Sequence, residues 1–186
     1  LQLAFKEWGL KMSDAQVIIG GDAPTRLASL MAGRMGATIL SPPHLTIATQ
    51  AGYRVLADMG DMNVSFTQSS LSARGGYLKE NRDRAKRFLR AYSEAIHVIK
   101  TDRARTVKVF ANRMRIDDPE TVRTTYEYFA PRFSFPPRVN LDGVRDTINF
   151  YAAQNPDFKN RKPEEFLDQS LMDELDKEGF FKKLGS

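Results

Sequence analysis

The sequence contains no cysteine, one tryptophan and two histidines among its 186 residues. The absence of cysteine excludes disulfides, thiolate metal sites and cysteine nucleophiles. No apolar run approaches the roughly 20 residues that a membrane-spanning helix needs, and the first residues do not show the charged and then apolar layout of a secretion signal. Hydrophobic residues make up 41% and charged residues 27% of the chain, which is typical of a globular protein that buries its own core.

The usual signatures of catalysis are also scarce. The two histidines, His44 and His97, stand far apart, and neither lies at metal-ligand spacing from another histidine or from a carboxylate cluster. Gly20-Gly21 is not accompanied by the other residues of a dinucleotide fingerprint or a phosphate-binding loop. The sequence therefore predicts no metal site, no cofactor and no enzymatic activity.

Two short apolar runs, Val17–Ile19 and Ala37–Leu40, flank a helix pattern that begins after Gly21. Runs of this kind, with several β-branched residues, are typical of strands buried on both faces. Pro24 falls in the first turn of the helix, where its missing N–H costs little. The order predicts a βαβ unit with parallel strands and a right-handed crossover, and Tyr53–Ala57 is expected to add another strand.

Both turns after the paired strands would lie at the same edge of this sheet, and each leads into a helix N-terminus that favours an anion. In open α/β sheets, ligands bind at that edge. Asp22 can cap its own helix or turn toward a cationic group of a ligand. A plain structural βαβ unit remains the alternative. The residues predicted to bind a ligand here are Gly21, Asp22, Thr25, Ser41, Pro42 and His44.

A resemblance to a known family rests on residues 20–43, which read Gly-Gly-Asp-Ala-Pro-Thr-Arg-Leu-Ala-Ser-Leu-Met-Ala-Gly-Arg-Met-Gly-Ala-Thr-Ile-Leu-Ser-Pro-Pro. This pattern resembles the second lobe of solute-binding proteins for ATP-binding-cassette importers, of the nitrate, sulfonate and taurine type. Residues 76–82 and 88–92 are similar to a later segment of the same family, with Arg82 in place of the expected proline. The resemblance extends over essentially the whole chain.

The resemblance implies an α/β fold of the type II periplasmic-binding-protein kind. The chain would hold an incomplete second lobe at 1–68, with a three-layer sheet, and the return crossover with the helical end of the first lobe at 69–186. Part of the first lobe would precede residue 1. The crossover is expected near residues 66–69, where Gln68 and Ser69 could reach the ligand cleft; a polar edge strand is the alternative.

The remainder of the chain has helical patterns. Apolar residues recur at helical spacing along 83–100, and further helices are expected over 103–114, from Asp118-Pro119 onward, over 141–152 with Asn140 as cap, and over 163–175. Residues 79–90 hold six basic and two acidic residues, within a net charge of +5 for the chain. Because the basic residues lie opposite an apolar stripe, a solvated face is favoured over nucleic-acid binding.

The function implied by the resemblance is that of the substrate-binding subunit of an importer. It would capture a small anionic or zwitterionic organic solute, such as a sulfonate, nitrate or taurine, and present it to a membrane permease without entering the membrane. The location would be the periplasm, or the cell exterior with a lipid anchor. Two alternatives share the fold: an effector-sensing domain of a transcription regulator, and a relative that binds or makes a pyrimidine precursor. Enzymes of the last kind carry a cysteine-rich motif, which this sequence does not have.

Overall fold

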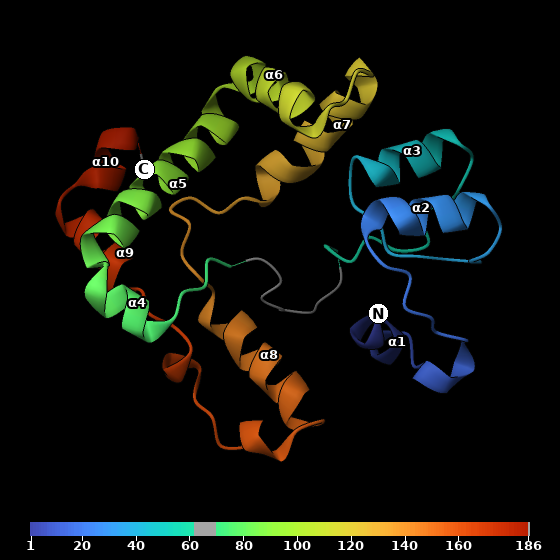
Figure 1. Ribbon diagram of the computed structural model, residues 1–186, viewed down its shortest axis with the longest axis horizontal. Coiled ribbons are helices and arrows are strands. Elements are labelled where there is room, and N and C mark those ends of the chain that lie inside the picture. Colours follow the sequence, from blue (N-terminus) through green and yellow to red (C-terminus); the bar gives the residue numbers. More distant parts are fainter. Residues whose placement is uncertain (62–69, 186) are drawn as a thin grey trace. The chain divides into compact units, whose positions relative to one another are not determined.

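The computed structural model describes residues 1–61 and 70–185, without the side chain of Leu3, and the described part is helical (Figure 1). None of the helices in this part is both long enough and apolar enough to cross a membrane. The α-helices are α1 (Gln2–Glu7), α2 (Ala23–Met31), α3 (His44–Gln50), α4 (Gly75–Glu80), α5 (Arg82–Thr101), α6 (Arg103–Met114), α7 (Pro119–Phe129), α8 (Leu141–Ala152), α9 (Ser170–Lys177) and α10 (Phe180–Leu184). Short 3-10 helices are η1 (Met12–Asp14), η2 (Ala130–Arg132), η3 (Pro156–Phe158) and η4 (Pro163–Glu165).

The predicted α/β fold of the periplasmic-binding-protein kind is wrong, because the described residues contain no strand and no sheet. Val17–Ile19, Ala37–Leu40 and Tyr53–Ala57 lie outside any regular element. A strand exists only when another strand takes up its backbone hydrogen bonds, and these segments have no such partner within 1–61 and 70–185. The helices between them form all the same, since a helix bonds its own backbone.

The chain divides into two compact units, each built from two stretches of sequence. Unit 1 comprises Leu1–Val64 and Ala104–Phe129, and unit 2 comprises Ser65–Arg103 and Ala130–Ser186. The predicted boundary between residues 68 and 69 falls outside the described residues.

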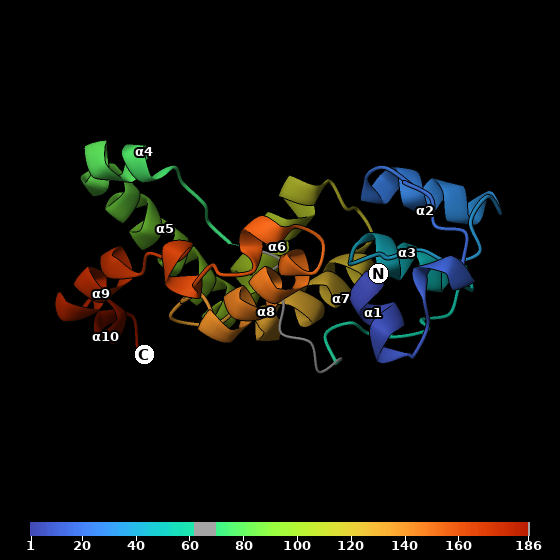
Figure 2. The ribbon, with the colours of Figure 1, turned by 90° about the horizontal axis from the view of Figure 1, so that it is seen from below.

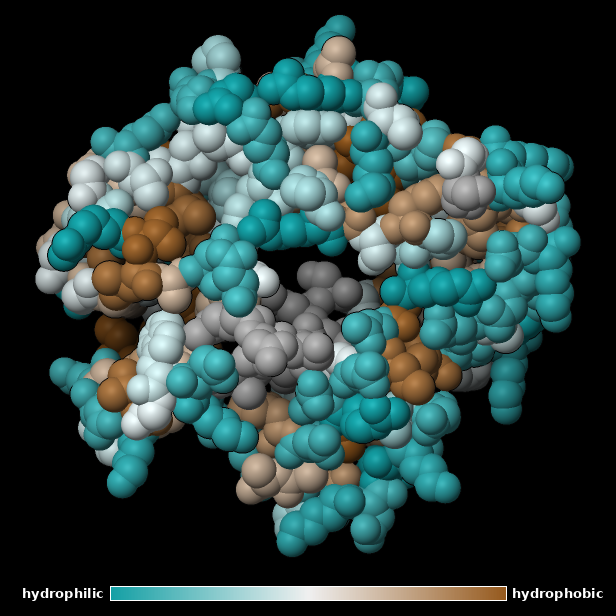
Figure 3. All heavy atoms as spheres, turned by 180° about the vertical axis from the view of Figure 1, so that it is seen from behind, coloured by the Kyte–Doolittle hydropathy of each residue, from teal (hydrophilic) through white to brown (hydrophobic). Residues whose placement is uncertain are grey.

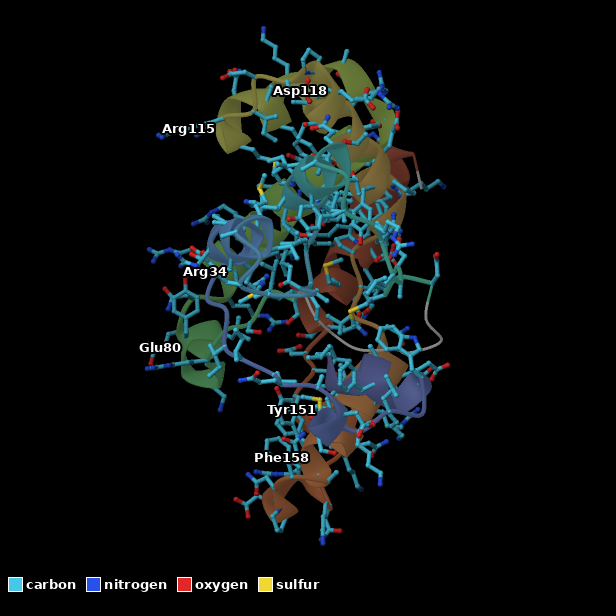
Figure 4. The ribbon with its side chains drawn as sticks, turned by 90° about the vertical axis from the view of Figure 1, so that its right-hand side faces the viewer. Arg34, Glu80, Arg115, Asp118, Tyr151 and Phe158 are labelled. Carbon is cyan, nitrogen blue, oxygen red and sulfur yellow. The ribbon has the colours of Figure 1, made fainter. Side chains whose placement is uncertain are left out.

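In unit 1, α3 packs against both α2 and α7. Leu27 and Leu30 of α2 and Ala48 of α3 are buried, and the hydroxyl groups of Thr46 and Thr124 join α3 to α7 at 2.9 Å. At the turn between α6 and α7 (Figure 4), the Asp118 carboxylate accepts hydrogen bonds from the backbone N–H and the hydroxyl of Thr121. The predicted start of a helix at Asp118-Pro119 is thereby confirmed.

Unit 2 has its core where α5, α9 and α10 lie side by side, as both ribbon views show (Figures 1 and 2). The core cluster consists of Met172, Leu175, Phe180 and Phe181, with Leu89, Phe135 and Leu184 packed against it. Ser93 is fully buried in α5, and its hydroxyl donates to the carbonyl oxygen of Leu89 at 2.8 Å. A polar side chain is tolerated there because the helix itself supplies its hydrogen-bond partner.

The predicted helices of 103–114 and 141–152 are confirmed, with the same bounds as α6 and α8. Asn140 caps α8 as predicted, since its side chain accepts from the backbone N–H groups of Asp142 and Gly143. The single helix expected over 163–175 is wrong. It is divided into η4 and α9, because the carboxylate of Asp168 accepts from the backbone N–H and hydroxyl of Ser170 and starts a new helix there.

Candidate functional site

The site that the sequence predicts begins at the N-terminus of α2. Gly21 has φ +74°, a left-handed conformation that glycine adopts without strain. Asp22 follows as the N-cap, and its Oδ1 accepts a hydrogen bond from the backbone N–H of Thr25 at 3.0 Å. Of the two roles considered for Asp22, the structure therefore has the capping one.

The electrostatics of Asp22 follow from this cap. Hydrogen bonds from Thr25 lower the pKa of the Asp22 carboxyl below its ordinary value, and electrostatic interactions with Arg26 and His44 lower it further. Asp22 is thus ionised at neutral pH, and His44, the first residue of α3, lies close enough to act on it. A carboxylate, a guanidinium and an imidazole gather around one helix N-terminus.

Arg26 is the residue that the sequence reasoning missed. Its guanidinium donates to the carbonyl oxygen of Gly21 and, at 3.3 Å, to that of Ile39. One side chain therefore ties the loop before α2 to the loop that leads to Ser41. An arginine one turn into a helix that follows a glycine turn was the available signal, because five N–H donors can span two loops.

The other predicted residues are placed as follows. Ser41 is exposed and its carbonyl oxygen accepts from the backbone N–H of Leu45 at 3.1 Å, whereas Pro42 is buried and His44 is half-buried. The structure thus has Gly21, Asp22 and Thr25 together at the start of α2 and His44 near enough to act electrostatically on Asp22, without the sheet edge that was predicted to join them. Gln68 and Ser69 lie outside the described residues.

A second charged arrangement, in unit 2, joins α5 to α9. Arg82 and Lys86 both bind the Glu174 carboxylate, and Lys86 and Arg90 both bind that of Glu178. The basic face of α5 was predicted to be solvated, yet these three basic residues are paired. The pairs lower the pKa of both glutamates and raise that of Lys86.

A shallow hollow lies at the corner of α4 and α5, and Figure 4 labels Glu80 at this corner. Both charge signs line it, because Glu80 and Asp83 stand among the basic side chains. Its lining residues are Lys79, Glu80, Asn81, Arg82, Asp83, Arg84 and Arg87. Mixed charge weakens its attraction for an anion. Within residues 1–61 and 70–185, no three metal-ligating side chains come together.

Aromatic rings gather near η3 of the same unit. Tyr151 and Phe158, which Figure 4 labels, have ring centroids 5.7 Å apart, and Phe158 stacks on Phe166 at 6.2 Å. The guanidinium of Arg161 lies over the Phe166 ring. These contacts fasten the turns after α8 to the helix.

Comparison of the chain with protein families, with curated proteins and with solved structures found no match.

Proposed function

We propose that the chain is part of a solute-binding protein of an importer and that unit 1 binds a small zwitterionic organic solute beside Asp22. The resemblance of residues 20–43, 76–82 and 88–92 to such proteins supports the proposal, as does one contact. Arg26 holds the Gly21 and Ile39 carbonyl groups together, so that the loops carrying Asp22 and Ser41 are neighbours. The proposal does not depend on a sheet, since the contacts of Arg26 hold together the two loops that strand pairing was expected to bring together.

The charges favour a zwitterion over a simple anion. The ionised Asp22 would repel a lone anion and attract an ammonium group. His44 and the hydroxyl of Ser41 offer donors for an acidic group on the same solute. An aminosulfonate such as taurine carries both groups at a short distance. The capping hydrogen bond keeps Asp22 in position for this contact.

The test is calorimetric titration of the full chain with taurine and, separately, with ethanesulfonate, which has no ammonium group. We expect taurine to bind more tightly. Asp22→Ser removes the charge and retains a side chain that caps α2, so it should weaken taurine binding roughly tenfold, the worth of one charge-assisted hydrogen bond. Ser41→Ala should weaken it by less.

Ser29→Ala is the matched control, because Ser29 is a hydroxyl residue of α2 about two helical turns after Asp22 and should leave the affinity unchanged. Equal affinities of the wild type and Asp22→Ser for taurine would contradict the site. Absence of any binding by either solute at millimolar concentration would contradict the proposed function itself.

A further inference from the structure

Helix α5 has basic side chains on two sides, and only one side is paired in the described structure. Arg82, Lys86 and Arg90 recur every four residues and face α9, where two glutamates bind all three. Arg84 and Arg87 lie on the other side of the helix. Both are exposed, and neither makes an ion pair or a side-chain hydrogen bond with any described residue. The positive charges on this side of α5 are therefore unpaired.

Exposed apolar groups lie beside these arginines. Phe88, one turn after Arg84, keeps 57% of its area exposed, and its ring stacks on that of Tyr92 at 6.5 Å. Ala91 and Ala95, further along the same side, are exposed as well, and short side chains let a second helix approach closely. Figure 3 shows, on one face of the molecule, that hydrophilic residues predominate and that hydrophobic ones form separate patches. Aromatic residues and arginine are the types that protein interfaces favour.

The hollow at the corner of α4 and α5 continues this side of the helix. Lys79 of α4 lines it together with Arg84 and Arg87, and Lys79 too has no ion pair within residues 1–61 and 70–185. Glu80 and Asp83 also line it. A uniform polyanion, such as a nucleic acid or an anionic membrane surface, would meet these carboxylates as well as the cations. A protein segment can instead place its own carboxylates opposite the cations alone.

The contact between α5 and α9 shows which kind of segment fits the basic side chains of α5. Glu174 and Glu178 of α9 lie four residues apart, and each carboxylate binds two basic side chains of α5. On the adjoining face of α9, Leu175 belongs to the apolar cluster against which Leu89 of α5 packs. One amphipathic helix thus supplies both the carboxylates and the apolar contact.

We propose that the exposed side of α5 around Arg84, Arg87 and Phe88, with Lys79 at its end, binds an acidic amphipathic helix of a partner protein. Carboxylates of that helix, spaced as they are in α9, bind the two arginines, and an apolar residue beside them covers Phe88. Charge complementarity of the same kind already joins α9 to the other side of α5. The proposal is independent of solute binding, because this surface belongs to unit 2 and the proposed solute site to unit 1.

The test is fluorescence anisotropy of a labelled synthetic peptide titrated with the full chain. The peptide is held helical by a hydrocarbon link and has glutamates four residues apart beside a stripe of leucines; a second peptide has glutamine in place of each glutamate. We expect the acidic peptide to bind about tenfold more tightly than the glutamine peptide, because only its carboxylates form charge-assisted contacts with the arginines. Added salt should narrow the difference, since it screens exposed charges.

Phe88→Ala should weaken binding of the acidic peptide by about tenfold or more, because aromatic residues at the centre of an interface contribute most of its affinity. Arg84→Gln combined with Arg87→Gln should weaken it by roughly fivefold, as expected for exposed ion pairs. The matched control is Lys108→Gln combined with Arg113→Gln, which removes the same charge from exposed positions of α6 that have no ion pair in the described residues. It should leave the affinity unchanged.

Circular dichroism of each variant verifies that the helices are retained. Equal affinities for the two peptides, or no binding of the acidic peptide at millimolar concentration, would overturn the proposal. An equal loss of affinity in the control variant would also overturn it, because net charge alone would then account for binding. So would tighter binding, through Arg84 and Arg87, of a single-stranded DNA oligonucleotide or of anionic lipid vesicles, since the surface would then select a polyanion over an acidic helix.

Discussion

The α5–α9–α10 assembly of unit 2 and the non-helical apolar segments of unit 1 bury their apolar residues to very different degrees. Leu175 of α9 is completely buried, whereas Leu56 of unit 1 is 77% exposed. A helix satisfies its own backbone and needs only one apolar stripe covered. A strand needs a neighbour for its backbone as well as its side chains. The difference shows that an apolar segment becomes buried where its backbone hydrogen bonds are also formed.

The largest expected effect comes from a leucine-to-alanine substitution, made once in the core of unit 2 and once in an exposed segment of unit 1. Leu175→Ala should lower the free energy of unfolding by about 3–4 kcal/mol, because it leaves a cavity among Met172, Phe180 and Phe181. Leu56→Ala should change it by less than about 0.5 kcal/mol. Urea unfolding followed by circular dichroism measures both values. Similar losses for the two variants would mean that the segment around Leu56 is packed in solution, and the comparison would fail.

A smaller loss of stability is expected when the N-terminal cap of one helix, α8, is removed, because the cap is a local contact and not part of the core. Asn140→Ala removes the acceptor for the N–H groups of Asp142 and Gly143 and should cost about 1 kcal/mol in urea unfolding. Asn140→Ser retains a capping oxygen and should cost less. If the serine and alanine variants lose the same free energy, the contribution of Asn140 is not its cap.

Caps and other interactions between residues close in sequence explain which parts of the fold could be predicted. The Asn140 and Asp118 caps and the spacing of apolar residues along α6 and α8 are read from neighbouring residues, and these predictions were confirmed. The division of 163–175 was missed because Asp168 can bind Ser170 two residues on, a local competition that periodicity does not register. Strand pairing depends on residues far away in sequence, and there the prediction was wrong.

The contacts of the candidate site fall into the same two groups, local ones that the sequence predicts and distant ones that it does not. Gly21 and the cap from Asp22 to Thr25 follow from a four-residue pattern that the sequence displays. The contact of Arg26 with the carbonyl of Ile39 spans 13 residues and depends on how the loop after α2 returns. The spacing shows that an arginine lies one turn into α2, but it does not identify the distant acceptor at Ile39, so Arg26 was not among the predicted residues.

The smallest effect concerns the ion pairs between α5 and α9, which also tie distant parts of the sequence together but do so at the surface. Surface pairs contribute little to stability individually. Hydrogen bonds from Arg82 and Lys86 lower the pKa of Glu174 in the folded state. A carboxyl with a lowered folded pKa stabilises the protein above its unfolded pKa, about 4.3 for glutamate, and this stabilisation is lost as the pH falls through the folded value.

Glu174→Gln should therefore leave a protein whose melting temperature falls less than that of the wild type between about pH 6 and about pH 3. The control is Glu164→Gln, because Glu164 is exposed on η4 and makes no ion pair in the described residues; it should follow the wild-type profile. Added salt should narrow the difference between wild type and Glu174→Gln, since it screens exposed charges. Coincident profiles for the wild type and Glu174→Gln at low salt would show that the pairs of Glu174 with Arg82 and Lys86 contribute nothing measurable to stability, and the contrast with unit 1 would then rest on burial rather than on these pairs.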